Sequence, residues 1–98
     1  MIETSPGDLE TVKKILAEYV PGFEVRVFGS RLIGQAKSYS DLDIAVVGKD
    51  KMAQTVFIKL KDAFQESNLP FRVDVIDWHR ISPEFQKIIA REYEVIQS

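Results

Sequence analysis

Asp41 and Asp43 are the residues whose type and spacing most directly suggest chemistry in this sequence. On an extended strand, residues two apart point to the same face and lie roughly 7 Å apart, at about 3.3 Å per residue. Two carboxylates so placed repel each other unless a cation lies between them. Such an oxygen site suits Mg²⁺, which also accepts substrate phosphates as ligands. The alternative is a capped strand start, with Ser40 and Asp41 in a side-chain turn and Asp43 solvated.

Asp74 is a further acid that interrupts an apolar segment, as Asp43 does. An uncompensated carboxylate is costly to desolvate in such a segment. If the strand that carries Asp43 and the strand that carries Asp74 are neighbours, Asp74 meets Asp41 and Asp43 on one face of the sheet. Three carboxylates on one face could hold two divalent ions about 3.5–4 Å apart, as nucleotidyl transfer requires. An edge-strand charge that favours solubility explains Asp74 equally well. Asp77 has the other strand parity and is predicted to be a cap or turn residue.

Gly29, Ser30 and Arg31 form a candidate phosphate-binding turn. Glycine allows a phosphate to approach the backbone closely, and the N–H groups at a helix start attract anions. Ser30 adds a hydroxyl donor, and Arg31 adds a charge-assisted fork for a terminal phosphate. The alternative is an ordinary strand-to-helix turn with a surface arginine. His79, the single histidine, is assigned a surface or capping role rather than a catalytic one.

Apolar periodicity and turn residues predict helices that alternate with strands around these residues. Helices are expected over about 5–21 and 51–66 and from residue 82 onward, with a short helical segment from Gly29 to about Lys37. Strands are expected over 23–28, 42–47 and 71–77, with a short final strand around 93–96. The fold class is therefore α/β or α+β, a small mixed sheet flanked by helices.

Length and composition restrict the class of protein. Ninety-eight residues allow a single domain, expected over 1–98, and the net charge of −2 argues against a protein that binds nucleic acid mainly by charge. The longest apolar runs span four residues, so no membrane segment is predicted, and the N-terminus does not have the pattern of a secretory signal. The sequence has no cysteine, which excludes disulfides and thiolate metal sites. We therefore expect a small cytoplasmic domain.

The stretch GSRLIGQAKSYSDLDIAVVG joins Gly-Ser to Asp-x-Asp across ten residues, and a strand carboxylate follows later. This pattern resembles the polymerase β nucleotidyltransferase superfamily, and within it the minimal nucleotidyltransferase branch, whose members are often encoded beside a HEPN-domain partner. The resemblance covers nearly the whole chain. It implies that Gly29 and Ser30 bind the triphosphate and that Asp41 and Asp43 ligate the catalytic metal pair. Asp74 would be the third carboxylate and would help to activate the attacking hydroxyl.

One position departs from the family pattern. Many relatives carry a second arginine in the sequence Gly-Ser-Arg-Ala-Arg-Gly, and this chain has Ile33 there. Lys37 is the candidate replacement for that arginine. The strength and selectivity of triphosphate binding depend on this difference.

Two functions from different classes follow from these residues. The first is an enzyme that uses Mg²⁺, with two ions expected and Mn²⁺ as a substitute, to transfer a nucleoside monophosphate from an NTP to an acceptor hydroxyl. The resemblance implies that the NTP is ATP, that the acceptor is a tyrosine on a HEPN toxin, and that the chain is an antitoxin. The alternative is a nucleotide-binding module that neutralises its partner by masking it. A drug-modifying transferase would need an additional substrate-binding domain.

The small size also predicts a partner surface. The core of such a chain is thin, so we expect an open groove for any ligand and an exposed apolar patch. The predicted contributors to the patch are Trp78, Phe85 and the segment 93–96, and Phe71 is expected in the core or facing a partner. Such a surface would take a helical partner or a second copy of the chain.

Overall fold

The computed structural model describes residues 2–34 and 40–98, in which helices and strands alternate as expected. The elements are α1 (Pro6–Tyr19), β1 (Glu24–Phe28), α2 (Ser30–Ile33), β2 (Leu42–Val47), α3 (Gln54–Gln65), β3 (Val73–Asp77), the 3₁₀ turn η1 (Trp78–Arg80), α4 (Pro83–Arg91) and β4 (Glu94–Gln97). The sequence predicted every element except η1, which it placed in an irregular turn. Lys37 lies outside the described residues.

Serine side chains begin two of the helices, because each caps a backbone N–H group that the first turn leaves without a helical partner. Oγ of Ser5 accepts a hydrogen bond from the Asp8 N–H at 3.1 Å, and Oγ of Ser82 accepts one from the Phe85 N–H at 3.1 Å. Each serine is followed by a proline, which suits the first helical position. Both helix starts are therefore those predicted from the sequence.

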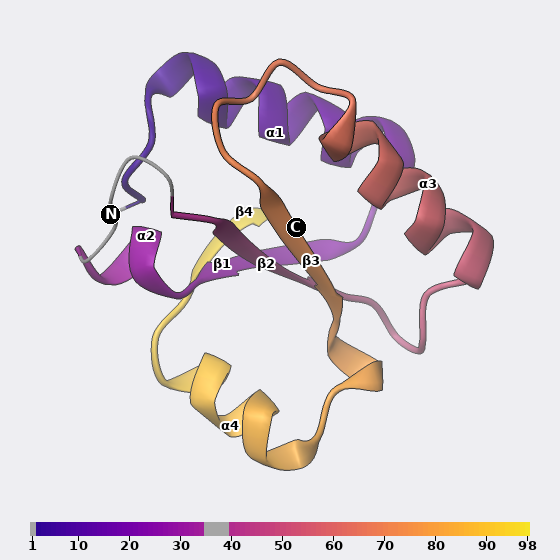
Figure 1. Cartoon of the computed structure of the whole chain (residues 1–98). Coiled ribbons are helices and arrows are strands. Elements are labelled where there is room, and N and C mark those ends of the chain that lie inside the picture. The colour runs from indigo at the N-terminus through magenta and orange to yellow at the C-terminus, as the bar shows by residue number, and fades with distance from the viewer. Residues whose placement is uncertain (1, 35–39) are drawn as a thin grey trace.

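The four strands form one mixed sheet in the order β3-β2-β1-β4 (Figure 1). β1 is antiparallel to both β2 and β4, whereas β2 is parallel to β3. A parallel pair needs a long crossover connection, and α3 supplies it between β2 and β3. The mixed α/β architecture expected from the sequence is confirmed, and β3 is an edge strand of the described sheet.

Helices α1 and α3 cover one face of the sheet, and α4 lies on the other side (Figure 1). Strand alternation sends successive side chains to opposite faces. Val25, Val27 and Ile44 are fully buried in the core on the helix-covered face. Asp43 and Asp74 have the opposite parity and belong to the other face. No described helix is long and apolar enough to cross a membrane.

The predicted apolar patch is found only in part. Tyr93 and Val95 are exposed, as expected. Phe85 instead packs edge-on against Phe28, with ring centroids 5.9 Å apart, and Ile96 packs against the core. The prediction was wrong for Phe85 because the sequence does not show which strand face α4 will cover, and it was wrong for Ile96 because this residue alternates with the exposed Val95 along β4 and faces the core.

Asp77 ends β3 as a buried carboxylate, 2% exposed, and holds three segments together. It accepts hydrogen bonds from the N–H groups of Met52 at 2.7 Å and His79 at 3.1 Å, and from Nε of Arg80 at 3.1 Å. The His79 ring lies 2.6 Å from the Gly48 carbonyl oxygen through Nε2. Asp77 is thus confirmed as a cap, and His79 contacts the backbone.

We predict that Asp77→Ala lowers the free energy of unfolding by about 3 kcal/mol, because the Met52 N–H group and the Arg80 guanidinium lose their shared acceptor. Urea denaturation in metal-free buffer measures the change. Asp62→Ala is the matched control on the exposed side of α3 and should stay within about 0.5 kcal/mol of the parent. Equal effects of the two substitutions would contradict the role given to Asp77.

Candidate functional site

Asp43 and Asp74 lie directly opposite each other on the neighbouring parallel strands β2 and β3. Phe28 of β1 pairs with Asp43 from the other side, so the three residues form a row across the sheet. The row belongs to the face opposite α1 and α3. The sequence made the meeting of Asp43 and Asp74 conditional on these two strands being neighbours, and the pairing of β2 with β3 meets that condition.

Gly29 brings the chain tightly past Asp43 as it leaves β1. Its φ of 84° lies in the left-handed region, which favours glycine. A Cβ atom at this position would collide with Oδ2 of Asp43, so a larger residue would displace the carboxylate or the turn. Ser30 begins α2 directly after this contact. The structure therefore places the Gly29-Ser30 turn beside Asp43, and the phosphate-binding role of the turn stays a prediction.

Electrostatic crowding is strongest at Asp43. Burial, together with the nearby carboxylates of Asp74 and Asp41, raises the pKa of this carboxyl from 3.8 to about 6. The Arg72 guanidinium opposes the shift. A positive charge placed among the carboxylates would favour the ionised form of Asp43.

Asp41 does not join the other two carboxylates. Its Oδ2 accepts a hydrogen bond from Arg72 at 3.0 Å. Among residues 2–34 and 40–98, no group of three or more His, Cys, Asp or Glu side chains is arranged to hold a metal ion. In this structure Asp43 and Asp74 are register partners and Asp41 is held by Arg72, and the metal-ligating roles of the three carboxylates stay a prediction. Asp41 precedes the first residue of β2, so no strand register holds its side chain on the site face.

The chemistry of Asp43 and Asp74 nevertheless fits a divalent cation. Both supply hard carboxylate oxygens, which Mg²⁺ prefers. Their direct opposition is unfavourable by itself, since like charges across a strand pair repel. Asp41 could add a ligand only after its ion pair with Arg72 opens. The donor set thus fits Mg²⁺ through two residues, with a third nearby.

Arg31 is buried, at 6% exposure, and its guanidinium binds backbone carbonyls. Nε donates to the Ser40 carbonyl at 2.9 Å, and a terminal nitrogen donates to the Glu3 carbonyl at 2.8 Å. The guanidinium carbon lies 4.3 Å from the ring centroid of Phe71. Arg31 thus ties the N-terminal segment and the approach to Asp41 onto α2. Sequence reasoning missed this role because the acceptors are backbone atoms far away in the chain, and the phosphate contact of Arg31 stays a prediction.

A cationic stack on the site face was also missed. The guanidinium carbon of Arg26 lies 4.9 Å from the ring centroid of Trp78 and 4.4 Å from that of Tyr93. Such contacts between a cation and aromatic faces are favourable. The two aromatics, expected in the core or at a partner surface, therefore hold Arg26 two residues before Phe28. Strand parity marks Arg26 as a site-face residue, but nothing in the sequence pairs it with distant rings.

A mixed sheet with a glycine turn beside paired strand carboxylates is the arrangement of a nucleotidyltransferase. The family model described as "Polymerase beta, Nucleotidyltransferase" matches residues 10–98. The chain therefore belongs to this family, is an enzyme of the nucleotidyltransferase class, and has the fold that the motif predicted.

The chain is also similar to individual nucleotidyltransferases in sequence and in fold. The chain is 47% identical over 96 residues to a protein of Haemophilus influenzae named as probable protein adenylyltransferase MntA, covering 98% of this chain and 84% of that protein. Among solved structures, a toxin–antitoxin complex with AMP-PNP has a TM-score of 0.74 at 24% identity, covering 89% of this chain and 70% of the other. The structure of a tri-AMPylated Shewanella oneidensis HEPN toxin with its MNT antitoxin has a TM-score of 0.63 at 20% identity, covering 90% and 67%. At these identities, the two structures show likeness of fold.

We predict that Asp43→Asn stabilises the metal-free protein above pH 6. The pKa of Asp43 is raised on folding, so the folded state binds more protons between about pH 4 and 6, and stability falls as the pH rises through that range. The asparagine removes this cost. We expect a gain of about 1 kcal/mol at pH 7.5, reduced by solvent screening of a half-exposed group, and a gain near zero at pH 4.

Urea denaturation in EDTA at the two pH values measures the effect. Asp62→Asn, at an exposed position on α3, is the control for loss of one negative charge. A stabilisation of Asp43→Asn that is the same at both pH values would contradict the electrostatic explanation.

Proposed function

We propose that this chain is a Mg²⁺-dependent adenylyltransferase that moves AMP from ATP to a tyrosine hydroxyl of a small helical HEPN-domain partner, and that it acts as the antitoxin of that pair. The opposition of Asp43 and Asp74 beside the Gly29 turn carries the proposal. The relationship to the Haemophilus protein supports adenylyl transfer. The complex of an AMPylated HEPN toxin with an MNT antitoxin supports the partner and the modification.

In this proposal the residues of the site divide the work. Asp43 and Asp74 would hold the Mg²⁺, and Asp41 would supply a third carboxylate if its ion pair with Arg72 opened. Bound magnesium supplies Lewis-acid stabilisation of the charge that develops on the phosphates. The Gly29-Ser30 turn binds the triphosphate through backbone N–H groups and the Ser30 hydroxyl.

Asp74 has a second task on the acceptor. It is exposed on the edge strand, so an incoming hydroxyl can reach its carboxylate. Asp74 accepts the proton of that hydroxyl as its oxygen attacks the α-phosphorus of ATP. The bond between the α-phosphorus and the bridging oxygen breaks, and pyrophosphate leaves.

Masking of the partner without transfer is the second candidate function. Two contacts favour it: Asp41 is engaged by Arg72, and Arg31 is engaged by backbone carbonyls. Ile33 in place of the second arginine of many relatives favours it as well. Masking would need only the surface of the protein, whereas transfer needs the carboxylates.

We predict that the double variant Asp41→Asn, Asp43→Asn no longer transfers AMP to the partner but still binds it. Intact-mass spectrometry of the HEPN-type partner after incubation with ATP and Mg²⁺ measures transfer, and co-purification measures binding. Asp50→Asn together with Asp62→Asn is the control, because both aspartates are exposed and lie outside the site. A double site variant that protects cells from the partner as well as the parent does would show that masking is the mechanism.

We also predict that ATP with Mg²⁺ or Mn²⁺ raises the melting temperature of the parent. A ligand that binds only the folded state stabilises it by mass action, about 2.7 kcal/mol at a hundred times its Kd. Asp43→Asn should remove most of the metal-dependent part of this rise. A shift that is unchanged in Asp43→Asn, measured by scanning calorimetry, would contradict metal binding at Asp43.

A further inference from the structure

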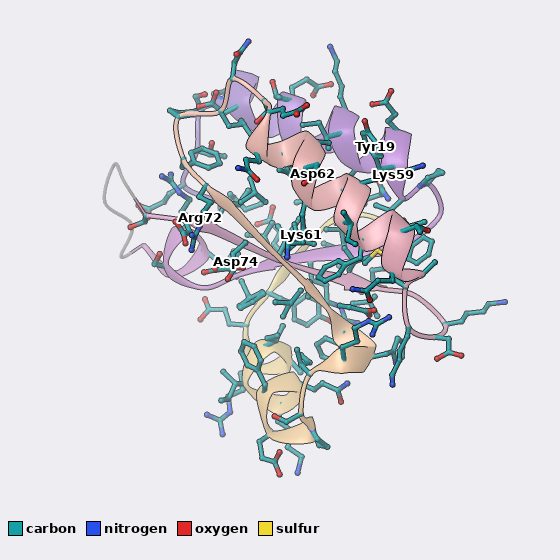
Figure 2. All side chains as sticks on the ribbon, turned by 45° about the vertical axis from the view of Figure 1, so that its right-hand side comes forward. Tyr19, Lys59, Lys61, Asp62, Arg72 and Asp74 are labelled. Carbon is teal, nitrogen blue, oxygen red and sulfur yellow. The ribbon has the colours of Figure 1, made fainter. Side chains whose placement is uncertain are left out.

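A groove of about 540 Å³ runs along the open edge of β3. Its walls come from the C-terminal half of α3, which contributes Lys61, Phe64 and Gln65, and from β3 and the residues just before it, up to Asp74 and Val75. Figure 2 shows Lys61 directed from α3 toward β3, on the side where Arg72 and Asp74 lie. The groove therefore shares Asp74 with the candidate site and extends away from it.

The edge of β3 beside this groove is open to a further strand. No described strand pairs with it, because β3 is the last strand in the order β3-β2-β1-β4. The Leu42 N–H group donates to the Arg72 carbonyl at 2.9 Å, which shows that the backbone groups of Arg72, and of every second residue after it, face β2. Alternate residues of β3 bond to β2, so the backbone groups of Val73 and Val75 face the open edge.

In any segment added to this edge as a strand, successive side chains would lie on opposite faces of the sheet. Val75 points to the helix-covered side, where it is buried, and Asp74 points to the site face. In an added strand, one side chain would lie on the Asp74 side and its two neighbours would lie toward Phe64 and Val75. Apolar neighbours suit that wall, and a hydroxyl on the other side would be presented to Asp74.

The charges on the rim favour an acidic occupant. Lys61 and Arg72 line the groove on its two sides, and both side chains are exposed. Nζ of Lys61 lies 5.0 Å from the ring centroid of Phe57, one turn earlier on the same helix. Arg72 is already paired with Asp41, so Lys61 is the cation of the rim that attracts a glutamate or aspartate side chain beside the hydroxyl residue.

We propose that the acceptor protein docks by adding an extended, acidic segment to the open edge of β3, with its hydroxyl side chain beside Asp74 and its apolar neighbours in the groove. Main-chain hydrogen bonds give such strand addition its affinity, and pockets for alternate side chains give it specificity. The proposal rests on the proposed transferase function, because it names how the acceptor of that reaction is held.

The test uses an acetylated Glu-Glu-Val-Tyr-Val-Glu-Glu peptide, whose symmetrical sequence suits either strand direction. Added to the ¹⁵N-labelled protein with the site variant Asp43→Asn, which stops transfer, it should slow amide exchange of Val73 and Val75 by about tenfold. The same peptide methylated along its backbone nitrogens keeps the side chains but cannot pair, and it should not bind. Equal binding of the methylated peptide, or slowed amides confined to other elements, would overturn the proposal.

Charge reversal on α3 supplies the matched variants. Lys61→Glu should weaken peptide binding by about tenfold, and Lys59→Glu, on the same helix but directed away from the groove, should change it by less than about twofold (Figure 2). Equal losses in the two variants would overturn the proposal. Concentration-dependent protection of Val73 and Val75 in the protein alone would also overturn it, since a second copy would then occupy the edge.

Transfer of AMP to the same peptide, measured by mass spectrometry with the parent protein, ATP and Mg²⁺, separates the two proposals. A peptide that binds at β3 without being adenylylated would contradict the transferase function and leave the docking mode intact. Adenylylation at the same rate in Lys61→Glu and on the methylated peptide would support transfer and overturn docking at β3.

Discussion

Two carboxylates of like charge face each other across the parallel pair of β2 and β3, and the organisation of the site follows from that contact. Asp43 and Asp74 are register partners, an arrangement that costs free energy in a sheet. Burial adds to the cost at Asp43, and together with the neighbouring carboxylates it raises the pKa of Asp43 to about 6. A protein that keeps this pair has a use for positive charge between them, and a nucleotidyltransferase, the class to which this chain belongs, can use that charge on phosphates.

The rest of the fold holds this pair in place and covers it only in part. Helices α1 and α3 cover the opposite face of the sheet, and α4 lies on the site face against Phe28 (Figure 1), which leaves Asp43 half-buried and Asp74 exposed. Gly29 lets the chain turn directly beside the Asp43 carboxylate. Arg31 and Asp77 stabilise the segments around the site. Each side chain is buried and forms hydrogen bonds with backbone groups of other segments. The polar contacts around the site are therefore mostly structural.

The position of Asp74 on an edge strand connects the site to a surface. Asp43 lies on an inner strand and is half-buried, whereas Asp74 is exposed beside an open ladder edge and a groove. The two explanations of Asp74 that the sequence left open, a catalytic carboxylate and an edge-strand charge, are compatible in this geometry. The edge position leaves the Asp74 carboxylate open to solvent, while its register partner Asp43 is half-buried on the inner strand.

Local sequence determined the elements and most of the candidate site. Serine-proline pairs begin α1 and α4, alternation defines β1, and an apolar run defines β2. The spacing of Gly29, Asp41, Asp43 and Asp74 indicated the family that the match over residues 10–98 confirms. The caps and strands depend on neighbours within a few residues, and the motif is a spacing of residue types along the chain; a sequence displays both directly. Only the tertiary structure decided that Asp41 pairs with Arg72, that Arg31 binds carbonyls of Glu3 and Ser40, and that α4 covers Phe28. Those contacts join segments 9 to 57 residues apart, and their geometry is set by strand order and helix packing, which no local pattern encodes.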